Sequence, residues 1–224
     1  MFRIASFDIG KKNFAFTVET FNVDLLVTHN PIAKHQRYYA DGTPTQAFQD
    51  VIDRIGASGE VELYHKEDLT KNCDPKSYLD PETFHNMTDL LSKFDSIWDT
   101  CQIFLVERQM SYKTKFNTMA LKLGQHCLAY FRIRYGRMKH TIEFPAYHKT
   151  QVLGAPRNTK GKAKYKRKKW AVEEATRILL LRKNSEAMTR FRTNKKKDDI
   201  ADCLLQTNAL VCMIQQDNYL CSLV

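Results

Sequence analysis

The sequence predicts an α/β protein in which a mixed five-stranded sheet, with its first three strands antiparallel, is flanked by helices. Two observations support this fold class. Short apolar runs bounded by turn residues, typical of strands, occur first as a group of three and then singly between helical segments. Longer segments carry apolar residues three and four positions apart, as in helices that pack on a sheet. The 224 residues are ample for one core, and we expect one domain over residues 1–224.

Three predicted strands open the chain. Residues 2–10 form an apolar run with a single acid near its end and a closing glycine. Residues 14–18 and 24–28 resemble the next two strands of an antiparallel meander. Residues 30–60 are polar and rich in turn residues, so we expect loop there, with a short helix near residues 46–55.

The middle of the chain alternates helices and strands. Asp80, Pro81 and Glu82 form a strong helix start, with an aspartate cap and a proline at the first helical position. Residues 102–107 are predicted to form an apolar strand that ends in an acid. Each of the two helices around this strand has an apolar stripe suited to core packing. The stripes are Phe84, Met87, Leu91, Phe94 and Trp98 in one helix, and Phe116, Ala120, Leu123, Cys127 and Phe131 in the other.

The last third of the chain is mainly helical. Residues 140–144 form the fifth predicted strand, which Pro145 stops. A basic run at residues 160–169 then leads into a helix with a small apolar face. The final helix is predicted to begin near Asp198 and to continue to about Gln216.

The basic residues are concentrated in one part of the chain. The formal net charge is +10, but residues 132–197 alone hold 21 Lys and Arg against 4 acids, a net of +17. The rest of the chain is acidic, with a net of −7. Such asymmetry favours a polyanionic partner, either nucleic acid or an anionic membrane surface, over a merely solvated face.

The cysteines and the chain start indicate an intracellular protein. None of the six cysteines forms a C-x-x-C pair, and several lie among apolar neighbours, so we expect reduced core thiols. Residues 2–10 have the pattern of a strand, so we expect no cleavable signal peptide. No apolar run approaches the roughly 18–20 residues of a membrane helix.

Acidic residues occur where strands end and where the last helix begins. Asp8 and Glu107 each end an apolar strand, and buried carboxylates are costly unless they are paired, hydrogen-bonded or bound to metal. Asp199 and Asp202 share a helix face, as Asp198 and Asp202 could also, although a helix N-terminus favours acids by itself. Oxygen ligands alone select Mg²⁺ or Mn²⁺, and two such ions suit phosphoryl displacement.

Three motifs carry a family resemblance. They are Asp8-Ile-Gly-Lys-Lys-Asn13, Val106-Glu107-Arg-Gln109 and Lys197-Asp198-Asp199-Ile-Ala-Asp202, in that order. Together they resemble the RuvC-like branch of the ribonuclease H-like superfamily. They are most similar to the Holliday junction resolvases of poxviruses and other large DNA viruses, and to fungal mitochondrial resolvases. The region 30–80 is longer than the family core requires and is taken as an insertion.

This resemblance implies a ribonuclease H-like fold and a crossover junction endodeoxyribonuclease. The implied catalytic and metal-binding residues are Asp8, Glu107, Asp199 and Asp202, with Asp198 as a further candidate ligand. The implied cofactor is Mg²⁺, as two ions per active site, with Mn²⁺ as a substitute. The implied reaction is hydrolysis of a phosphodiester by metal-activated water. The residues expected to contact DNA are Arg108, Gln109, Lys160, Lys162, Lys164, Lys166, Arg167, Lys168, Lys169, Lys195, Lys196 and Lys197.

The implied partner is branched double-stranded DNA, the four-way junction. Such a junction has two symmetric strands to cut, so paired nicks by a homodimer are implied. The helix of residues 84–98 or that of residues 116–131 is a candidate dimer element, although both stripes suit an intramolecular core. The implied location is the host-cell cytoplasm for a large DNA virus, and the nucleus or mitochondrion otherwise.

Other interpretations stay open at this point. A more general ribonuclease H-like endonuclease, acting on flaps, branched DNA or RNA–DNA hybrids, would use the same acids. A non-catalytic DNA-binding protein would keep the basic block and hold the acids for structural reasons. An actin-like ATPase also begins with a strand and an Asp-x-Gly turn, but 224 residues are too few for its two lobes.

Overall fold

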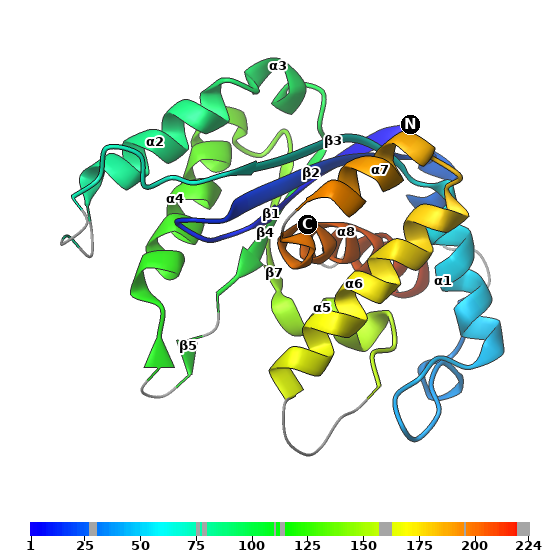
Figure 1. Ribbon diagram of the computed structural model, residues 1–224. Helices are drawn as coiled ribbons and strands as arrows, with labels where there is room; N and C mark the ends of the chain where they lie inside the picture. Colours follow the sequence, from blue (N-terminus) through cyan, green and yellow to red (C-terminus); the bar gives the residue numbers. More distant parts are fainter. Residues whose placement is uncertain are drawn as a thin grey trace.

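A five-stranded mixed sheet lies between two layers of helices (Figure 1). The strands are β1 (Phe2–Asp8), β2 (Phe14–Phe21), β3 (Glu60–Glu67), β4 (Ile103–Arg108) and β7 (His140–Pro145). Their order in the sheet is β3-β2-β1-β4-β7, with β1, β2 and β3 antiparallel and β4 and β7 parallel to β1. The predicted fold class is confirmed. The computed structural model describes residues 1–26, 31–74, 77, 80–109, 111–112, 115–156, 163–194 and 196–218.

The third strand is not where the sequence pattern placed it. Residues 23–26 form a short 3-10 helix, η1 (Val23–Leu26), and residues 27–28 lie outside the described ranges. The third strand is β3, within the region taken as an insertion. Its sequence Glu-Val-Glu-Leu-Tyr-His-Lys-Glu is rich in charge because β3 is an edge strand, so it lacks the apolar run that marks a buried strand.

One helical layer consists of α2 (Pro81–Ser92), α3 (Asp95–Trp98) and α4 (Thr118–Tyr135). Both predicted stripes face the sheet: Met87, Leu91 and Trp98 pack with Leu123, Cys127 and Phe131 in one core cluster. The first stripe is not on one continuous helix, because the chain breaks at Phe94 (φ −109°, ψ 17°). The fold-back is closed by the Trp98 indole, whose Nε1 donates to the Leu91 carbonyl at 2.7 Å.

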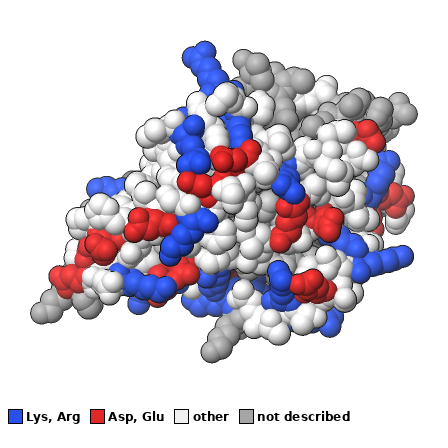
Figure 2. All heavy atoms as spheres, turned by 90° about the horizontal axis from the view of Figure 1, so that it is seen from above, with Lys and Arg blue, Asp and Glu red and all other residues white. Residues whose placement is uncertain are grey.

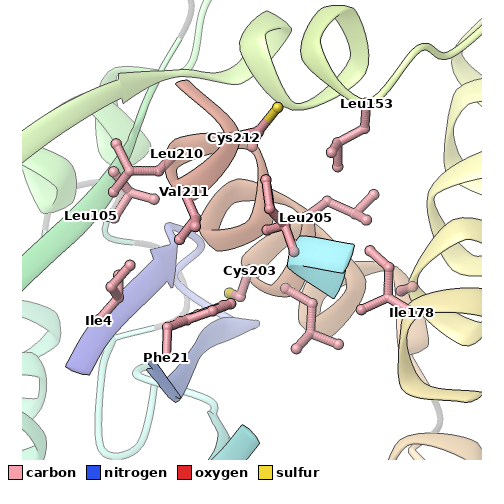
Figure 3. Close-up of a cluster of buried hydrophobic side chains, with 14 of the residues drawn as sticks. Ile4, Phe21, Leu105, Leu153, Ile178, Cys203, Leu205, Leu210, Val211 and Cys212 are labelled. Atoms are coloured by element: carbon pink, nitrogen blue, oxygen red, sulfur yellow. The ribbon is translucent and has the colours of Figure 1, made fainter. Parts of the chain in front are cut away.

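The other layer is built around α8 (Lys197–Asp217), with α1 (Gln46–Ser58), α5 (Ala146–Val152), α6 (Ala163–Leu181) and α7 (Ser185–Thr193) around it. Every residue of α8 from Cys203 to Gln216 is buried, as expected for a helix enclosed on all sides. Figure 3 shows Cys203 and Leu205 of α8 between the strand residues Ile4 and Phe21 and Ile178 of α6. The predicted start and end of this helix are confirmed within two residues.

Several short elements complete the fold. The helices α5 and α7 and the hairpin of β5 (Ser111–Tyr112) and β6 (Lys115–Phe116) were not predicted, and a 3-10 turn η2 spans Lys34–Gln36. The five cysteines within the described ranges are free, and all but Cys73 are buried. Across the part of the chain that is described, no helix combines the length and the hydropathy needed to cross a lipid bilayer.

Candidate active site

Two acids meet because their strands are parallel neighbours. Phe7 of β1 lies opposite Val106 of β4, so Asp8 and Glu107 follow at the same carboxyl edge of the sheet. Side chains alternate along a strand, and Phe7 and Val106 pack under α4. Asp8 and Glu107 therefore point to the opposite face, which α8 covers. The carboxyl ends of parallel strands are where α/β folds place their ligand sites.

The helix α8 brings the other acids to this edge. The Ser6 hydroxyl of β1 donates to the Gln206 Oε1 at 3.2 Å, which fixes the height of α8 over the strands. Its first turns, with Asp198, Asp199 and Asp202, then reach the ends of β1 and β4. Ile200, Ala201, Leu204 and Leu205 are buried against the sheet and neighbouring helices, as the sequence pattern predicted.

A buried lysine lies among these acids. The Lys149 Nζ donates to the Glu107 Oε1 at 2.8 Å and lies 3.0 Å from the Asp202 Oδ1. Lys149 belongs to α5, which begins directly after β7 at the carboxyl end of the strand parallel to β4. Its side chain is 9% exposed, so its charge needs these carboxylates. One ammonium group thus holds an acid of a strand and an acid of α8 together.

The remaining acids of α8 have lysines of their own. The Lys66 Nζ of β3 lies 3.0 Å from the Asp199 Oδ2, and Lys168 of α6 donates a hydrogen bond to Asp198. The Asp199 Oδ2 is buried, yet it accepts no hydrogen bond. The Lys168 side chain is itself 52% exposed, so its pair with Asp198 lies nearer to solvent than the pair of Lys66 and Asp199. Each lysine comes from a different element of the fold.

The electrostatics are those of crowded carboxylates. Burial, and then the neighbouring Glu107 and Asp202, raise the pKa of Asp8 well above its ordinary value. Burial also raises the pKa of Asp202, although Lys149 opposes this shift. For Lys149, burial alone would lower the pKa, but Glu107, Asp202 and Asp8 together raise it. Such opposed shifts in one place are typical of functional sites.

The donor set fits hard divalent cations. Asp8, Glu107, Asp199 and Asp202 offer oxygens only, and the buried Asp199 Oδ2 lacks a hydrogen-bond donor. In the described residues, however, no group of three or more His, Cys, Asp or Glu side chains is close enough to hold an ion. Lys149 and Lys66 pair with the acids in this arrangement. A cation would have to replace Lys149 or Lys66 at their carboxylates.

The residues around the acids form a connected loop region. A Cβ on Gly10 would lie 3.2 Å from the Asn13 carbonyl oxygen, so the turn after β1 leaves little room for a side chain. The Lys196 Nζ donates to the Asn13 Oδ1 at 2.8 Å, which links this turn to the start of α8. Gln109, expected to contact DNA, donates through Nε2 to the Glu107 Oε2 at 3.2 Å. It therefore orients an acid.

The other residues expected to contact DNA have varied surroundings. Arg108 and Arg167 are exposed, and Lys169 forms an exposed ion pair with Glu173 at 3.6 Å. Lys166 is exposed and has an interaction partner, and Lys197 is partly buried. Lys164 belongs to α6. The expected contacts Lys160, Lys162 and Lys195 lie outside the described residues.

The basic helix α6 borders a hollow of about 750 Å³. Its lining includes Lys34, Arg37 and Arg167, with Tyr38 and Asp217. Arg37 is held in place, because it donates to the Ile32 carbonyl at 2.7 Å and to the Asp217 Oδ2 at 3.1 Å. On the face seen from above in Figure 2, by contrast, basic and acidic side chains are interspersed.

Sequence reasoning missed Lys149 and Lys66. The signal for Lys149 was present: a lysine follows the predicted strand at residues 140–144, whose carboxyl end adjoins that of β4. Lys66 had no such signal, because the strand that carries it was not recognised. Asp8, Glu107, Asp199 and Asp202 were predicted from strand ends, helix spacing and the three motifs, and the fold brings them to one edge.

Comparison with solved structures supports the fold. The RuvC structure of Thermus thermophilus matches with a TM-score of 0.50 over 95% of this chain and 97% of that chain, at 10% identity. This likeness confirms the ribonuclease H-like fold. The fowlpox virus resolvase in complex with Holliday junction DNA gives a TM-score of 0.49 at 15% identity over 99% of each chain. The yeast mitochondrial Holliday junction resolvase gives 0.49 at 16% identity over 97% of this chain and 83% of that chain.

Comparison of sequences identifies relatives over nearly the whole length. No protein-family model matches the chain. Uncharacterized protein 97L of Invertebrate iridescent virus 3 is 36% identical over 95% of this chain and 97% of its own. Uncharacterized protein 170L of Invertebrate iridescent virus 6 is 30% identical over 92% of this chain and 87% of its own. The protein therefore belongs to the same family as these two iridescent virus proteins.

Proposed function

We propose that the protein is a metal-dependent endonuclease that resolves four-way DNA junctions by paired nicks. The observation that carries this proposal is the meeting of Asp8, Glu107, Asp199 and Asp202 at the carboxyl edge of β1 and β4. A RuvC fold and a chain with a strongly basic segment support it. A cluster of carboxylates repels a phosphodiester unless bound cations offset its negative charge, so this cluster in a DNA-binding protein favours metal ions at the site.

The proposed roles follow from position. Asp8, Glu107, Asp199 and Asp202 hold Mg²⁺, with Mn²⁺ as a substitute. When bound, these ions supply an activated water and offset charge on the phosphate oxygens. Asp198, which pairs with Lys168, stays a further candidate ligand. Gln109 orients Glu107, and Lys149 holds Glu107 and Asp202 in place through one ammonium group.

DNA is held by the basic side chains near this edge. Arg108 follows Glu107 directly and is exposed, so it can meet a phosphate beside the acids. Arg167 and the exposed lysines of α6 extend the positive surface away from the site. These contacts carry no base preference, because lysine and arginine on phosphates position the duplex without reading its sequence.

Two active sites require two copies of the chain. The predicted stripes on α2 and α4 are both used inside the molecule, so neither is the dimer face. The outer side of α4 carries Ile133, which is 85% exposed, beside an apolar hollow of about 340 Å³ between α2 and α4. We place the homodimer contact there, where a large apolar side chain would otherwise meet water.

The test is cleavage of a synthetic four-way junction in the presence of Mg²⁺. Wild-type protein should cut it, and Asp199→Asn should lower the rate at least about 100-fold while junction binding persists. Glu186→Gln is the matched control, since Glu186 is an exposed acid on α7 that pairs with Arg190 in its own helix. That variant should cut like wild type.

The choice of substrate distinguishes this proposal from the alternatives. A plasmid with an extruded cruciform should become linear, because paired nicks cut both strands at the junction. Unpaired nicks would instead give open circles. Equal cutting of flaps or RNA–DNA hybrids would identify a general endonuclease. Binding without any cutting, in Mg²⁺ and in Mn²⁺, would identify a non-catalytic DNA-binding protein.

A further inference from the structure

Lys66 belongs to a row of residues that crosses four strands. Asp8 of β1 pairs with Ala15 of β2, and Ala15 pairs with Lys66 of β3. Both strand pairs are antiparallel. Directly paired residues point to the same face, so all three face α8. Glu107 continues the row on β4. Ala15 is small and fully buried, which leaves space over β2 for the long side chain of Lys66 to reach toward the acids.

Lys66 ends at Asp199, an acid of the site whose buried Oδ2 lacks a hydrogen bond. Its Nζ lies 3.0 Å from the Asp199 Oδ2, and both side chains are largely buried, at 19% and 15% exposure. The Asp199 Oδ2 is enclosed and accepts no hydrogen bond, so charge attraction is what Lys66 supplies. A buried carboxylate held only by charge is costly for the fold. It is also open to exchange for a stronger cation.

We propose that Lys66 is a positioning residue that holds Asp199 in the metal-free protein and is displaced when a divalent cation binds. This inference rests on the proposed function, because it takes Asp199 as a metal ligand. It also gives the region 30–80 a role. That region supplies the third strand of the sheet, and through Lys66 it controls how readily the site accepts metal.

Lys66 and a divalent cation would compete for the Asp199 carboxylate. An ammonium group and a divalent cation that use the same carboxylate exclude each other, so each weakens the binding of the other. Removing the Lys66 charge should therefore tighten metal binding. It should also destabilise the metal-free protein, because Asp199 is then left buried without a partner. A purely structural lysine would produce the second effect without the first.

The experiment measures Mn²⁺ binding by calorimetry without DNA, and the unfolding midpoint with and without Mn²⁺. Lys66→Met should bind Mn²⁺ at least about fivefold more tightly than wild type. Its midpoint in chelator should fall by about 3–6 °C. Lys66→Arg should keep both wild-type values. Lys66→Gln should follow Lys66→Met, and it serves as the second variant should the methionine protein not fold.

The matched control is Lys71→Met. Lys71 lies just beyond β3 and pairs with Glu67, and its side chain is 69% exposed. The substitution changes the net charge by the same amount without touching Asp199. It should leave Mn²⁺ affinity unchanged. Equal tightening in both methionine variants would show a general charge effect and would overturn the proposal.

Two further outcomes separate this inference from the proposed function. If wild type binds Mn²⁺, Asp199→Asn loses that binding, and Lys66→Met and Lys66→Gln do not tighten it, then only the role of Lys66 is wrong. If wild type binds neither Mn²⁺ nor Mg²⁺, the metal-dependent function is wrong and the inference falls with it.

Discussion

Lys149 shows how much one side chain organises in this fold. It is nearly enclosed, and its ammonium contacts Glu107 from a strand and Asp202 from a helix. Without it, two partly buried carboxylates would face each other and Asp8 without a compensating charge. The cost of an uncompensated buried charge exceeds the gain from a typical surface ion pair by several fold.

Replacing Lys149 with methionine should therefore destabilise the metal-free protein strongly. We expect a loss of about 3 kcal/mol in the free energy of unfolding, measured by urea denaturation in chelator at pH 8. The matched control is Lys169→Met, which removes an exposed ion pair with Glu173. It should cost no more than about 0.5 kcal/mol. A loss for Lys149→Met as small as that of the control would contradict the assigned role.

The loss should depend on pH in a defined direction. Burial raises the pKa of Asp8 and of Asp202 in the folded protein above the ordinary aspartate value. The folded state then binds more protons than the unfolded state between the ordinary and the raised values, so stability falls as pH rises through that interval. Removing Lys149 increases the repulsion among Asp8, Glu107 and Asp202, and protonation relieves this repulsion at lower pH. The difference between variant and wild type should accordingly be smaller at pH 5 than at pH 8.

At the scale of elements, the buried strands and helices could be predicted from the sequence. The strands β1 and β4 and the helix α8 are apolar throughout or on one face, so their sequences carry the signal. The edge strand β3 carries charges on a surface that water reaches, and its pattern resembles a loop. The pairing of Lys66 with Asp199 depends on β3, so it could not be predicted from the sequence.

The junction between α1 and β3 is packed around an arginine. Arg182 follows directly after α6, and its Nη1 lies 2.7 Å from the Glu19 Oε2 in the core. Its Nε donates to the Gly56 carbonyl at 2.9 Å. The pair is almost fully buried, and it ties α6 to β2 and to the end of α1. Space beside it is scarce at Gly59, whereas Gly56 has room for a methyl group.

Two glycine substitutions should consequently have opposite effects. A Cβ on Gly59 would lie 2.5 Å from the Arg182 Nη2 and 2.7 Å from the Phe21 Cε1, so Gly59→Ala must displace one of them. We expect a loss of about 1–3 kcal/mol in unfolding free energy. Gly56 lies inside α1, and a Cβ on it would lie 3.5 Å from the Ile178 Cγ1 of α6, an ordinary van der Waals contact. Gly56→Ala should stabilise by about 0.5–1 kcal/mol.

Thermal or urea unfolding of both variants measures this contrast. The two glycines lie three positions apart at one helix end, so differences in the unfolded chain largely cancel between them. Similar changes for both alanines would mean that the space around Arg182 can adapt. The role of the arginine as a fixed tie between α6 and α1 would then be wrong.

At the scale of the whole molecule, charge that is separate along the sequence becomes mixed in space. The sequence has a basic block of +17 and an acidic remainder of −7. In the fold, Lys149 and Lys168 of that block reach back to Glu107, Asp202 and Asp198. The counts predicted a polyanionic partner, and the strand ends and motifs predicted an acidic site. Neither predicted that some of the basic residues pair with these acids.

The proposed dimer gives the last prediction, because paired cutting needs two sites in one particle. Ile133→Glu places a charge on the outer face of α4, where wild type has an apolar side chain that is 85% exposed. Burying that charge at an interface would be costly, so the dissociation constant should rise at least about tenfold. Sedimentation and light scattering should then find one chain per particle at concentrations where wild type has two.

The matched control is Leu180→Glu, on the opposite helical layer, where the leucine is 58% exposed. It introduces the same charge at an exposed apolar position and should leave the dimer intact. On a cruciform plasmid, Ile133→Glu should convert linear product into open circles, since single chains nick without a partner. A wild-type protein that stays monomeric on junction DNA, or an Ile133→Glu protein that still dimerises, would show that this face of α4 is not the contact.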